Sequence, residues 1–140
     1  MTANRPYAQA LDRVRAAGLR PTRQRKALAK LLFDTGDRHV TAEQLHGEAL
    51  AGGIRVSLAT VYNTLHQFTK AGLLREVVVQ SSRSYFDTNT TEHHHFFDET
   101  MATLEDIPGH LVTVSDLPAP PPGSEVERVD VIVRLRPKRP

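Results

Sequence analysis

The order of hydrophobic patterns along residues 1–90 constrains the fold of this 140-residue chain more than any other feature. Four segments carry apolar residues three and four positions apart, which is the helical period. The two segments that follow are rich in β-branched and aromatic residues, as strands are. Helices followed by a β-hairpin are the order of a winged helix-turn-helix, in which the helix before the hairpin enters the major groove of DNA.

Polar residues at helix starts predict where the four helices begin. The first helix covers residues 5–17. Thr22 is the predicted N-cap of the second helix and Ser57 that of the fourth, because their hydroxyls can accept from backbone N–H groups of the first turn. The segment "HVTAEQLHGEAL" opens the third helix, and its Thr41 and Gln44 have the spacing of a capping box.

Strand candidates follow the fourth helix. The predicted hairpin consists of residues 73–80 and 83–88, with Ser81 and Ser82 as its turn. Further strand candidates are residues 93–97, 111–117 and 128–136. The last of these has one apolar face, because Val129, Val131, Val133 and Leu135 alternate with other residues. So few strands bury little surface alone, which predicts that the chain forms a homodimer.

These patterns predict an α+β protein with two domains. Residues 1–90 are expected to form a winged helix-turn-helix DNA-binding domain, and residues 91–140 a small β-rich dimerisation and sensing domain. Residues 1–83 hold 13 Lys and Arg against 6 Asp and Glu, whereas residues 84–140 hold 5 against 10, so the net charges are +7 and −5. A basic part joined to an acidic one is typical of a nucleic-acid reader attached to another module.

Composition excludes several other classes of protein. The chain has no cysteine, so disulfides and cysteine-ligated structural zinc are impossible. No apolar run approaches the roughly 18 residues that span a bilayer, and the first residues lack the apolar core of a signal peptide. We therefore expect a cytoplasmic protein without a membrane partner.

Three consecutive histidines, His93, His94 and His95, stand in the segment "TEHHHFFDET". On a strand, His93 and His95 would point to one face, and His94 to the other together with Phe96. The first pair could chelate a small cation, and a single imidazole beside a phenylalanine could ligate haem iron. A solvated strand end is the third reading, and the residues alone leave all three open.

Several motifs resemble the ferric uptake regulator superfamily. They are "LRPTRQR" at 19–25, "HVTAEQL" at 39–45, "SLATVYNTL" at 57–65 and "EHHH" at 92–95, and together the resemblance covers residues 10 to about 107. The run "HHHFF", the following "LEDIP" and the ending "EVERVDVIVRLRPKR" are most similar to the iron response regulator branch. Members of that branch resemble haem- and iron-responsive repressors.

The resemblance implies a set of DNA contacts. Arg20 matches a basic residue that enters an A·T-rich minor groove, and Tyr62 matches a tyrosine that touches thymine methyls or phosphate. Asn63 departs from the arginine of many members, and asparagine favours adenine where arginine favours guanine. The other expected DNA-binding residues are Thr22, Arg23, Arg25, Lys26, Ser57, Thr60 and Gln67, of which Arg23, Arg25 and Lys26 would position the backbone.

The resemblance also implies the sensing residues. The family's regulatory metal site matches His39, Asp87, His94 and Glu105, and His93 and His95 complete our metal-ligand set for Fe(II) or Mn(II). Phe96 stands where a further histidine is usual, and Glu99 and Ala102 stand where the family has zinc-binding cysteines. The expected haem ligands are His93, His94 and His95, and His46 and His66 are either second ligands or surface residues.

The function implied is a homodimeric regulator of haem-synthesis and iron-homeostasis genes. It would bind an A·T-rich inverted repeat of double-stranded DNA and lose that binding when haem binds, with a haem-synthesis enzyme as candidate haem donor. One alternative is an orthodox repressor that needs Fe(II), Mn(II) or Zn(II) as corepressor. Others are a haem carrier without DNA and a metal-dependent hydrolase using His93, His95 and Asp98. We do not expect an enzyme, because no helical His-Glu-x-x-His and no nucleophile motif is present.

Overall fold

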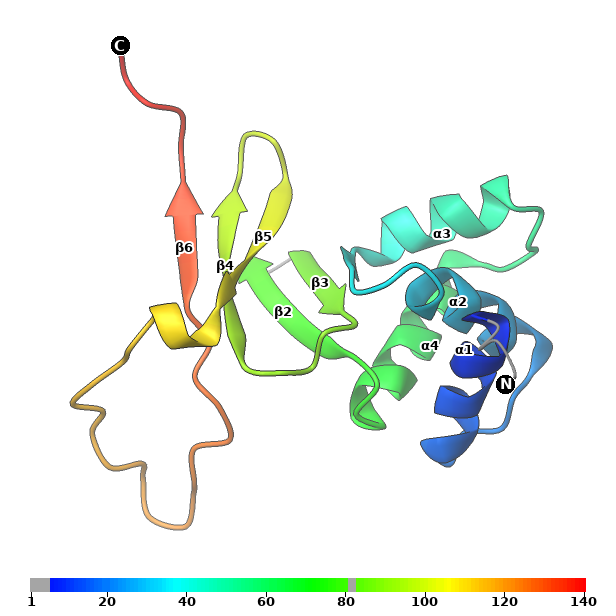
Figure 1. The fold of residues 1–140 in the computed structure, drawn as a ribbon, viewed down its shortest axis with the longest axis horizontal. Helices are drawn as coiled ribbons and strands as arrows, with labels where there is room; N and C mark the ends of the chain where they lie inside the picture. The colour runs from blue at the N-terminus through cyan, green and yellow to red at the C-terminus, as the bar shows by residue number, and fades with distance from the viewer. Residues whose placement is uncertain (1–5, 81–82) are drawn as a thin grey trace, which may run out of the picture. The chain divides into compact units, whose positions relative to one another are not determined.

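The computed structural model describes residues 6–80 and 83–140 (Figure 1). The chain forms two compact units, Met1–Thr90 and Thr91–Pro140. The first unit holds the helices and a small antiparallel sheet, and the second holds a separate sheet. The predicted α+β class, a winged helix-turn-helix followed by a small β-rich domain, is confirmed.

Four helices build the first unit: α1 (Pro6–Ala16), α2 (Arg23–Phe33), α3 (Ala42–Ala51) and α4 (Leu58–Lys70). Their starts follow the predicted caps. The hydroxyls of Thr22 and Ser57 each accept from the backbone N–H of the third residue of the helix that they cap, α2 and α4 respectively. Thr41 and Gln44 form the complete capping box of α3. The apolar faces meet in one core, whose fully buried members include Leu28, Leu32, Leu45, Leu65 and Phe68.

The wing sheet of the first unit contains β1 (His39–Val40), β2 (Arg75–Gln80) and β3 (Arg83–Asp87), in the order β1-β3-β2. The predicted turn at Ser81 and Ser82 lies outside the described residues. One local expectation was wrong: His39 and Val40 were assigned to the opening of the third helix, but they form β1. Thr41 separates the two elements, since its extended backbone and its capping side chain begin α3.

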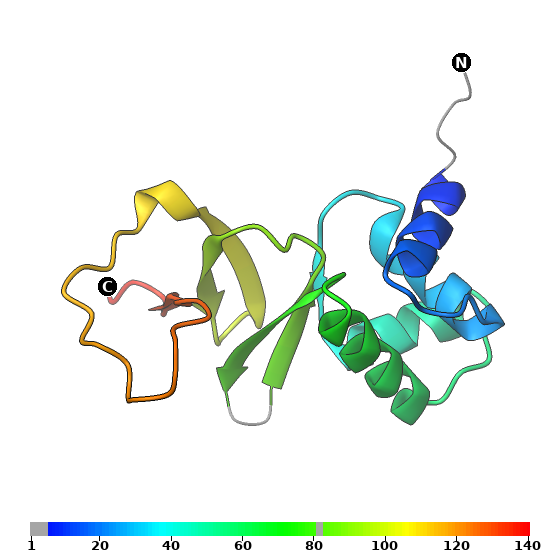
Figure 2. The ribbon, with the colours of Figure 1, turned by 90° about the horizontal axis from the view of Figure 1, so that it is seen from below.

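The sheet of the second unit has the order β5-β4-β6, from β4 (His93–Asp98), β5 (Thr103–Pro108) and β6 (Ile132–Leu135). β5 is antiparallel to β4, whereas β6 is parallel to it. The sequence did not predict β5, and the strand predicted at 111–117 is absent. That segment follows a short 3-10 helix (Gly109–Leu111) and starts the long connection seen in Figures 1 and 2. Both edges of β4 are already paired with β5 and β6.

The apolar face predicted on the last strand remains at the surface of the single chain. Val129, Val133 and Leu135 are 36%, 37% and 39% exposed, so intrachain packing does not cover them. β6 is also shorter than predicted, because regular pairing with β4 begins only at Ile132. Among the described residues, no helix is long and apolar enough to span a membrane.

Candidate DNA-binding surface and metal site

Helix α4 presents a polar face to solvent. Its buried side consists of Val61, Thr64, Leu65 and Phe68, which pack into the core of the first unit. The remaining positions leave Asn63, His66 and Gln67 exposed. Side chains of this size and polarity on one helical face are suited to reach base edges in a groove. The structure therefore leaves Asn63 and Gln67 accessible on the exposed face of α4.

Arg25 links α2 to this helix. Its Nε and Nη2 donate to Oε1 of Gln67 at 3.3 and 2.9 Å, and its Nη1 donates to the backbone carbonyl of Arg20 at 2.9 Å. From its sequence position, Arg25 was expected to touch the DNA backbone. In the structure, its guanidinium holds two helices and the preceding turn together.

The predicted contacts near the start of α2 and α4 face a common hollow. A cavity of about 240 Å³ is lined by residues of both helices, namely Thr22, Gln24, Arg25, Thr60, Asn63, Thr64 and Gln67. Thr22 and Ser57 are engaged as N-caps, and the Ser57 hydroxyl also donates to Thr60 Oγ1 at 2.9 Å. Arg20 and Arg23 are exposed and Lys26 is half-buried, so these cations remain accessible at the same end of α2.

Tyr62 is oriented by α3. Its hydroxyl donates to Oε1 of Glu43 at 2.7 Å, and this hydrogen bond raises the pKa of the Tyr62 phenol. The ring lies nearly parallel to that of His66, with 6.3 Å between centroids, and His66 in turn meets the ring of Phe86 edge-on at 5.5 Å. Tyr62 thus keeps its ring at the surface in a defined orientation.

The histidine run lies on β4, and its side chains alternate as predicted. His93 and His95 are buried, with exposed fractions of 4% and 1%, whereas His94 and Phe96 are half-buried. The Nε2 atoms of His93 and His95 lie 3.5 and 3.3 Å from the same oxygen, Oδ1 of Asp106 on β5. The two imidazole centroids are 4.6 Å apart. This triad of His93, His95 and Asp106 has its ligand atoms within 4.8 Å of one another.

The tautomer of His93 suits a metal ligand. Its Nδ1 lies 2.7 Å from the carbonyl oxygen of Thr91, and a carbonyl only accepts, so Nδ1 carries the proton. Nε2 then directs its lone pair toward the Asp106 carboxylate. A hydrogen bond from the other ring nitrogen is the usual way in which proteins orient a metal-binding imidazole. The residues present therefore fit a small divalent cation.

The acid beside the two buried histidines is Asp106, and not the predicted Glu105. Glu105 was predicted as a ligand, but it pairs with Phe96, whereas Asp106 pairs with His95. Adjacent residues of a strand point to opposite faces, so Asp106, and not Glu105, shares the face of the two imidazoles. Sequence reasoning missed Asp106, because only the pairing of β5 with β4 distinguishes the two acids.

His39 and Asp87 belong to the first unit. They are direct partners in the antiparallel pairing of β1 with β3. Asp87 is buried, and its Oδ1 accepts from the backbone N–H of Asn89 at 2.9 Å. The ring of His39 meets that of Tyr85 edge-on, with 6.1 Å between centroids. These two predicted ligands are thus neighbours within the wing sheet.

Of the other predicted haem ligands, His94 and His46 form hydrogen bonds with the backbone. The N–H of Val131 donates to Nδ1 of His94 at 3.1 Å, so the neutral ring carries its proton on Nε2. His46 donates from Nε2 to the carbonyl of Val56 at 3.0 Å. His66 is exposed on α4. His94 therefore stands apart from the triad, on the opposite face of β4.

Comparison with known proteins gives a consistent result. The model of the Ferric uptake regulator family matches residues 16–115. The peroxide-responsive repressor PerR of Staphylococcus aureus is 32% identical over 99 residues, which are 71% of this chain and 66% of the relative, so the chain covers slightly less than two thirds of that protein.

Solved structures share the fold. The ferric uptake regulator from Pseudomonas aeruginosa with manganese has a TM-score of 0.67 at 23% identity, covering 91% of this chain and 97% of that one. The ferric uptake regulator from Francisella tularensis with iron has a TM-score of 0.68 at 20% identity, covering 86% and 93%.

Proposed function

The chain belongs to the ferric uptake regulator family, and from this premise we propose that it is a metal-responsive transcription regulator that binds operator DNA as a homodimer. The first unit would bind DNA through α4 and the start of α2. The second unit would hold a divalent cation and supply the dimer contact. The similar proteins are regulators by name, and neither a hydrolase nor a haem carrier accounts for the exposed polar face of α4.

The observation that carries the proposal is the convergence of His93 and His95 on one oxygen of Asp106. Two imidazole nitrogens and a carboxylate oxygen form a donor set that first-row divalent metals such as Fe(II) and Mn(II) accept. Both imidazoles are buried and their Nε2 atoms lie beside the same carboxylate oxygen, an arrangement that suits one small ion better than the plane of a porphyrin. This favours a cation as the signal read by the triad.

Binding to DNA can be tested against metal directly. We would measure fluorescence anisotropy of a labelled A·T-rich inverted repeat with metal-free protein, and then with added Mn(II). We expect Mn(II) to raise the affinity, since a ligand that prefers the DNA-binding arrangement shifts the population toward it. Tight binding by metal-free protein that Mn(II) leaves unchanged would exclude the corepressor role of the cation.

The salt dependence of the same assay tests the DNA surface. Arg20, Arg23 and Lys26 are accessible cations, and their contacts with phosphates would release counterions. The logarithm of the affinity should therefore fall linearly and steeply as the logarithm of salt concentration rises. A flat response across the physiological range would rule out this surface as the source of affinity.

Haem is a second candidate signal, and the position of His94 favours it as the ligand. His94 lies on the face of β4 opposite the triad and shares that face with Phe96, two residues on. To bind iron through Nε2, the neutral imidazole must move its proton to Nδ1 and give up the hydrogen bond from Val131. Haem binding would therefore remove one of the two hydrogen bonds that hold Val131, the residue before β6, against β4, and leave the bond from the His95 N–H to its carbonyl. In this way haem would disfavour the DNA-binding dimer and control haem-synthesis and iron-homeostasis genes.

A haem titration separates this second candidate from the first. We would follow the Soret band of wild-type protein and of the His94→Ala and His93→Ala variants. Loss of the Soret shift only in His94→Ala would support haem binding by His94. Equal spectra for all three proteins would exclude His94 as the haem ligand. His46→Ala and His66→Ala would then identify a second axial ligand. Release of labelled operator by haem, without added metal, tests the regulatory consequence.

A further inference from the structure

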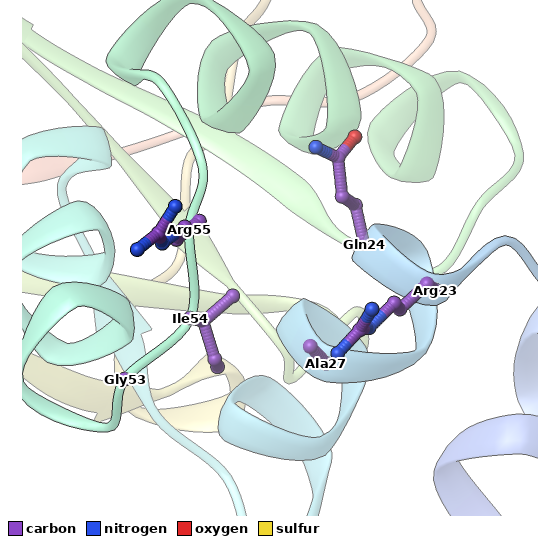
Figure 3. A pocket seen from close by; sticks show the side chains of 6 residues that line it. All are labelled: Arg23, Gln24, Ala27, Gly53, Ile54 and Arg55. Carbon is purple, nitrogen blue, oxygen red and sulfur yellow. The ribbon is translucent and has the colours of Figure 1, made fainter.

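A hollow on the first unit lies between α2 and the segment 52–55 that follows α3. It consists of two adjoining cavities of about 450 and 710 Å³, whose walls share Arg23, Ala27 and Ile54. Figure 3 shows Ile54 and Arg55 across the smaller cavity from Arg23 and Ala27. Cavities that bind small organic molecules have volumes of roughly 300–1,000 Å³. Arg23 and Lys26 on its rim are also proposed DNA contacts, but its apolar residues have no part in the proposed binding of DNA or metal.

The walls combine an apolar floor with a cationic rim. Ala27, Leu31 and Ile54 provide the floor. Arg23 and Lys26 stand three positions apart on α2, and Arg55 belongs to the opposite wall of the smaller cavity. Arg38 also borders the larger cavity, but its guanidinium is bonded to both carboxylate oxygens of Glu48, at 2.8 and 2.6 Å. Lys30 is exposed and borders the larger cavity as well, so the accessible positive charge extends along α2 from Arg23 to Lys30.

Asp34 lines the larger cavity, and one of its carboxyl oxygens is buried behind that wall. Oδ1 of Asp34 is buried and makes no hydrogen bond within the described part of the chain. A buried polar atom without a partner is costly, and such atoms are uncommon in folded proteins. Rotation of the Asp34 carboxyl group toward the cavity would let a bound molecule that donates an N–H or O–H recover that cost. A DNA backbone would not, because phosphates are acceptors and need no apolar floor.

We propose that this hollow binds a small amphipathic anion. Its acidic head would lie at Arg23 and Arg55, its apolar body would cover Ala27, Leu31 and Ile54, and a donor group would reach Asp34. The site would thus be separate from the triad and would take a ligand of a different chemical class. Each of the three requirements corresponds to one part of the wall, so a ligand that lacks any of them should bind less tightly.

The test uses 8-anilinonaphthalene-1-sulfonate, which carries a sulfonate, apolar rings and an N–H. Metal-free full-length protein without DNA would be titrated by fluorescence and by amide NMR shifts. We expect one saturable site, with shifts concentrated at Ala27, Asp34 and Ile54. Ala27→Phe, which fills both cavities, should weaken binding at least about tenfold, or about 1.4 kcal/mol. Asp34→Ala, which removes the buried acceptor, should weaken it by several fold.

The control variant is Ala16→Phe, which adds the same ring to an exposed position at the end of α1. It should bind the probe as the wild-type protein does. Unchanged affinity in Ala27→Phe, with its fold verified by amide NMR, would overturn the proposal. So would the absence of saturable binding combined with weaker operator binding in Arg55→Ala and Lys30→Ala, because the hollow would then be part of a phosphate track.

Discussion

Arg25 on α2 and Gln67 on α4 are joined by two hydrogen bonds, in which Nε and Nη2 of the guanidinium donate to one amide oxygen. The pair connects a residue in the first turn of α2 with one in the last turns of α4. It therefore fixes the separation of the two helices that would approach DNA together. Both residues were expected to touch DNA, and in the structure without DNA they form hydrogen bonds with each other.

Gln67→Leu should weaken operator binding to a similar degree for all operator sequences. The leucine keeps the helix but removes the acceptor, so the Arg25 side chain is no longer held against α4. The hydrogen bonds themselves should contribute about 0.5–1.5 kcal/mol to stability. Urea unfolding of Gln67→Leu, Arg25→Ala and the double variant would measure the coupling. Additive losses of stability would mean that the two side chains act independently.

Asp106→Asn should lower the affinity for Mn(II) by at least about tenfold, as expected when a charged ligand atom next to oriented imidazoles is lost. Glu105→Gln is the matched control, because it removes the same charge one residue earlier on the opposite face of β5. Isothermal titration with metal-free protein would measure both. If Glu105→Gln is the more damaging change, the acid predicted from the sequence is the ligand after all.

Glu43→Gln should lower the pKa of Tyr62. Glu43 accepts the hydrogen bond of the protonated phenol, which raises that pKa above its ordinary value of about 10. The folded protein thus holds this proton more tightly than the unfolded chain does. The resulting stability is present below pH 10 and is lost as pH rises above it. Absorbance titration at the tyrosinate band would show the shift, and Tyr62→Phe would identify the transition.

Glu99→Gln, a change in the second unit, is the control for that titration. It should leave the Tyr62 transition in place, since Glu99 bonds to Arg134 and not to the phenol. The pKa of Tyr85 is also raised, because the ring is buried, and its transition should be the same in Glu43→Gln. Equal titration curves for wild type and Glu43→Gln would contradict the assignment.

Val133→Glu with Leu135→Glu should convert a dimer into monomers. The two side chains are exposed on β6 in the single chain, and a partner that covered them would bury apolar surface. Arg136→Glu adds a negative charge next to the strand without touching the apolar face, and it should remain dimeric. Sedimentation velocity distinguishes the two states. A dimeric double variant would place the interface elsewhere.

Local chemistry explains why much of the first unit could be predicted. The N-caps Thr22, Thr41 and Ser57 accept hydrogen bonds from residues only three positions away. The capping residue and the helix start that it stabilises therefore lie in one short segment of sequence. The stripe of Val61, Leu65 and Phe68 likewise follows from the helical period. The alternation of His93, His94 and His95 needed only the assumption of a strand.

The remaining features depended on which segments pair. The strands β1 and β5 could not be predicted, and neither could the absence of a strand at 112–117. A strand is stable only beside a partner, and the partner can lie far away in the sequence. The same holds for the candidate site. Sequence alone determined that two imidazoles share a face of β4, but the register of β5 decided that Asp106, and not Glu105, lies beside them. Tertiary structure also decided which ring nitrogen of His94 carries the proton. The N–H that bonds to Nδ1 belongs to Val131, which is 37 residues further along the chain and reaches His94 only because β6 pairs with β4.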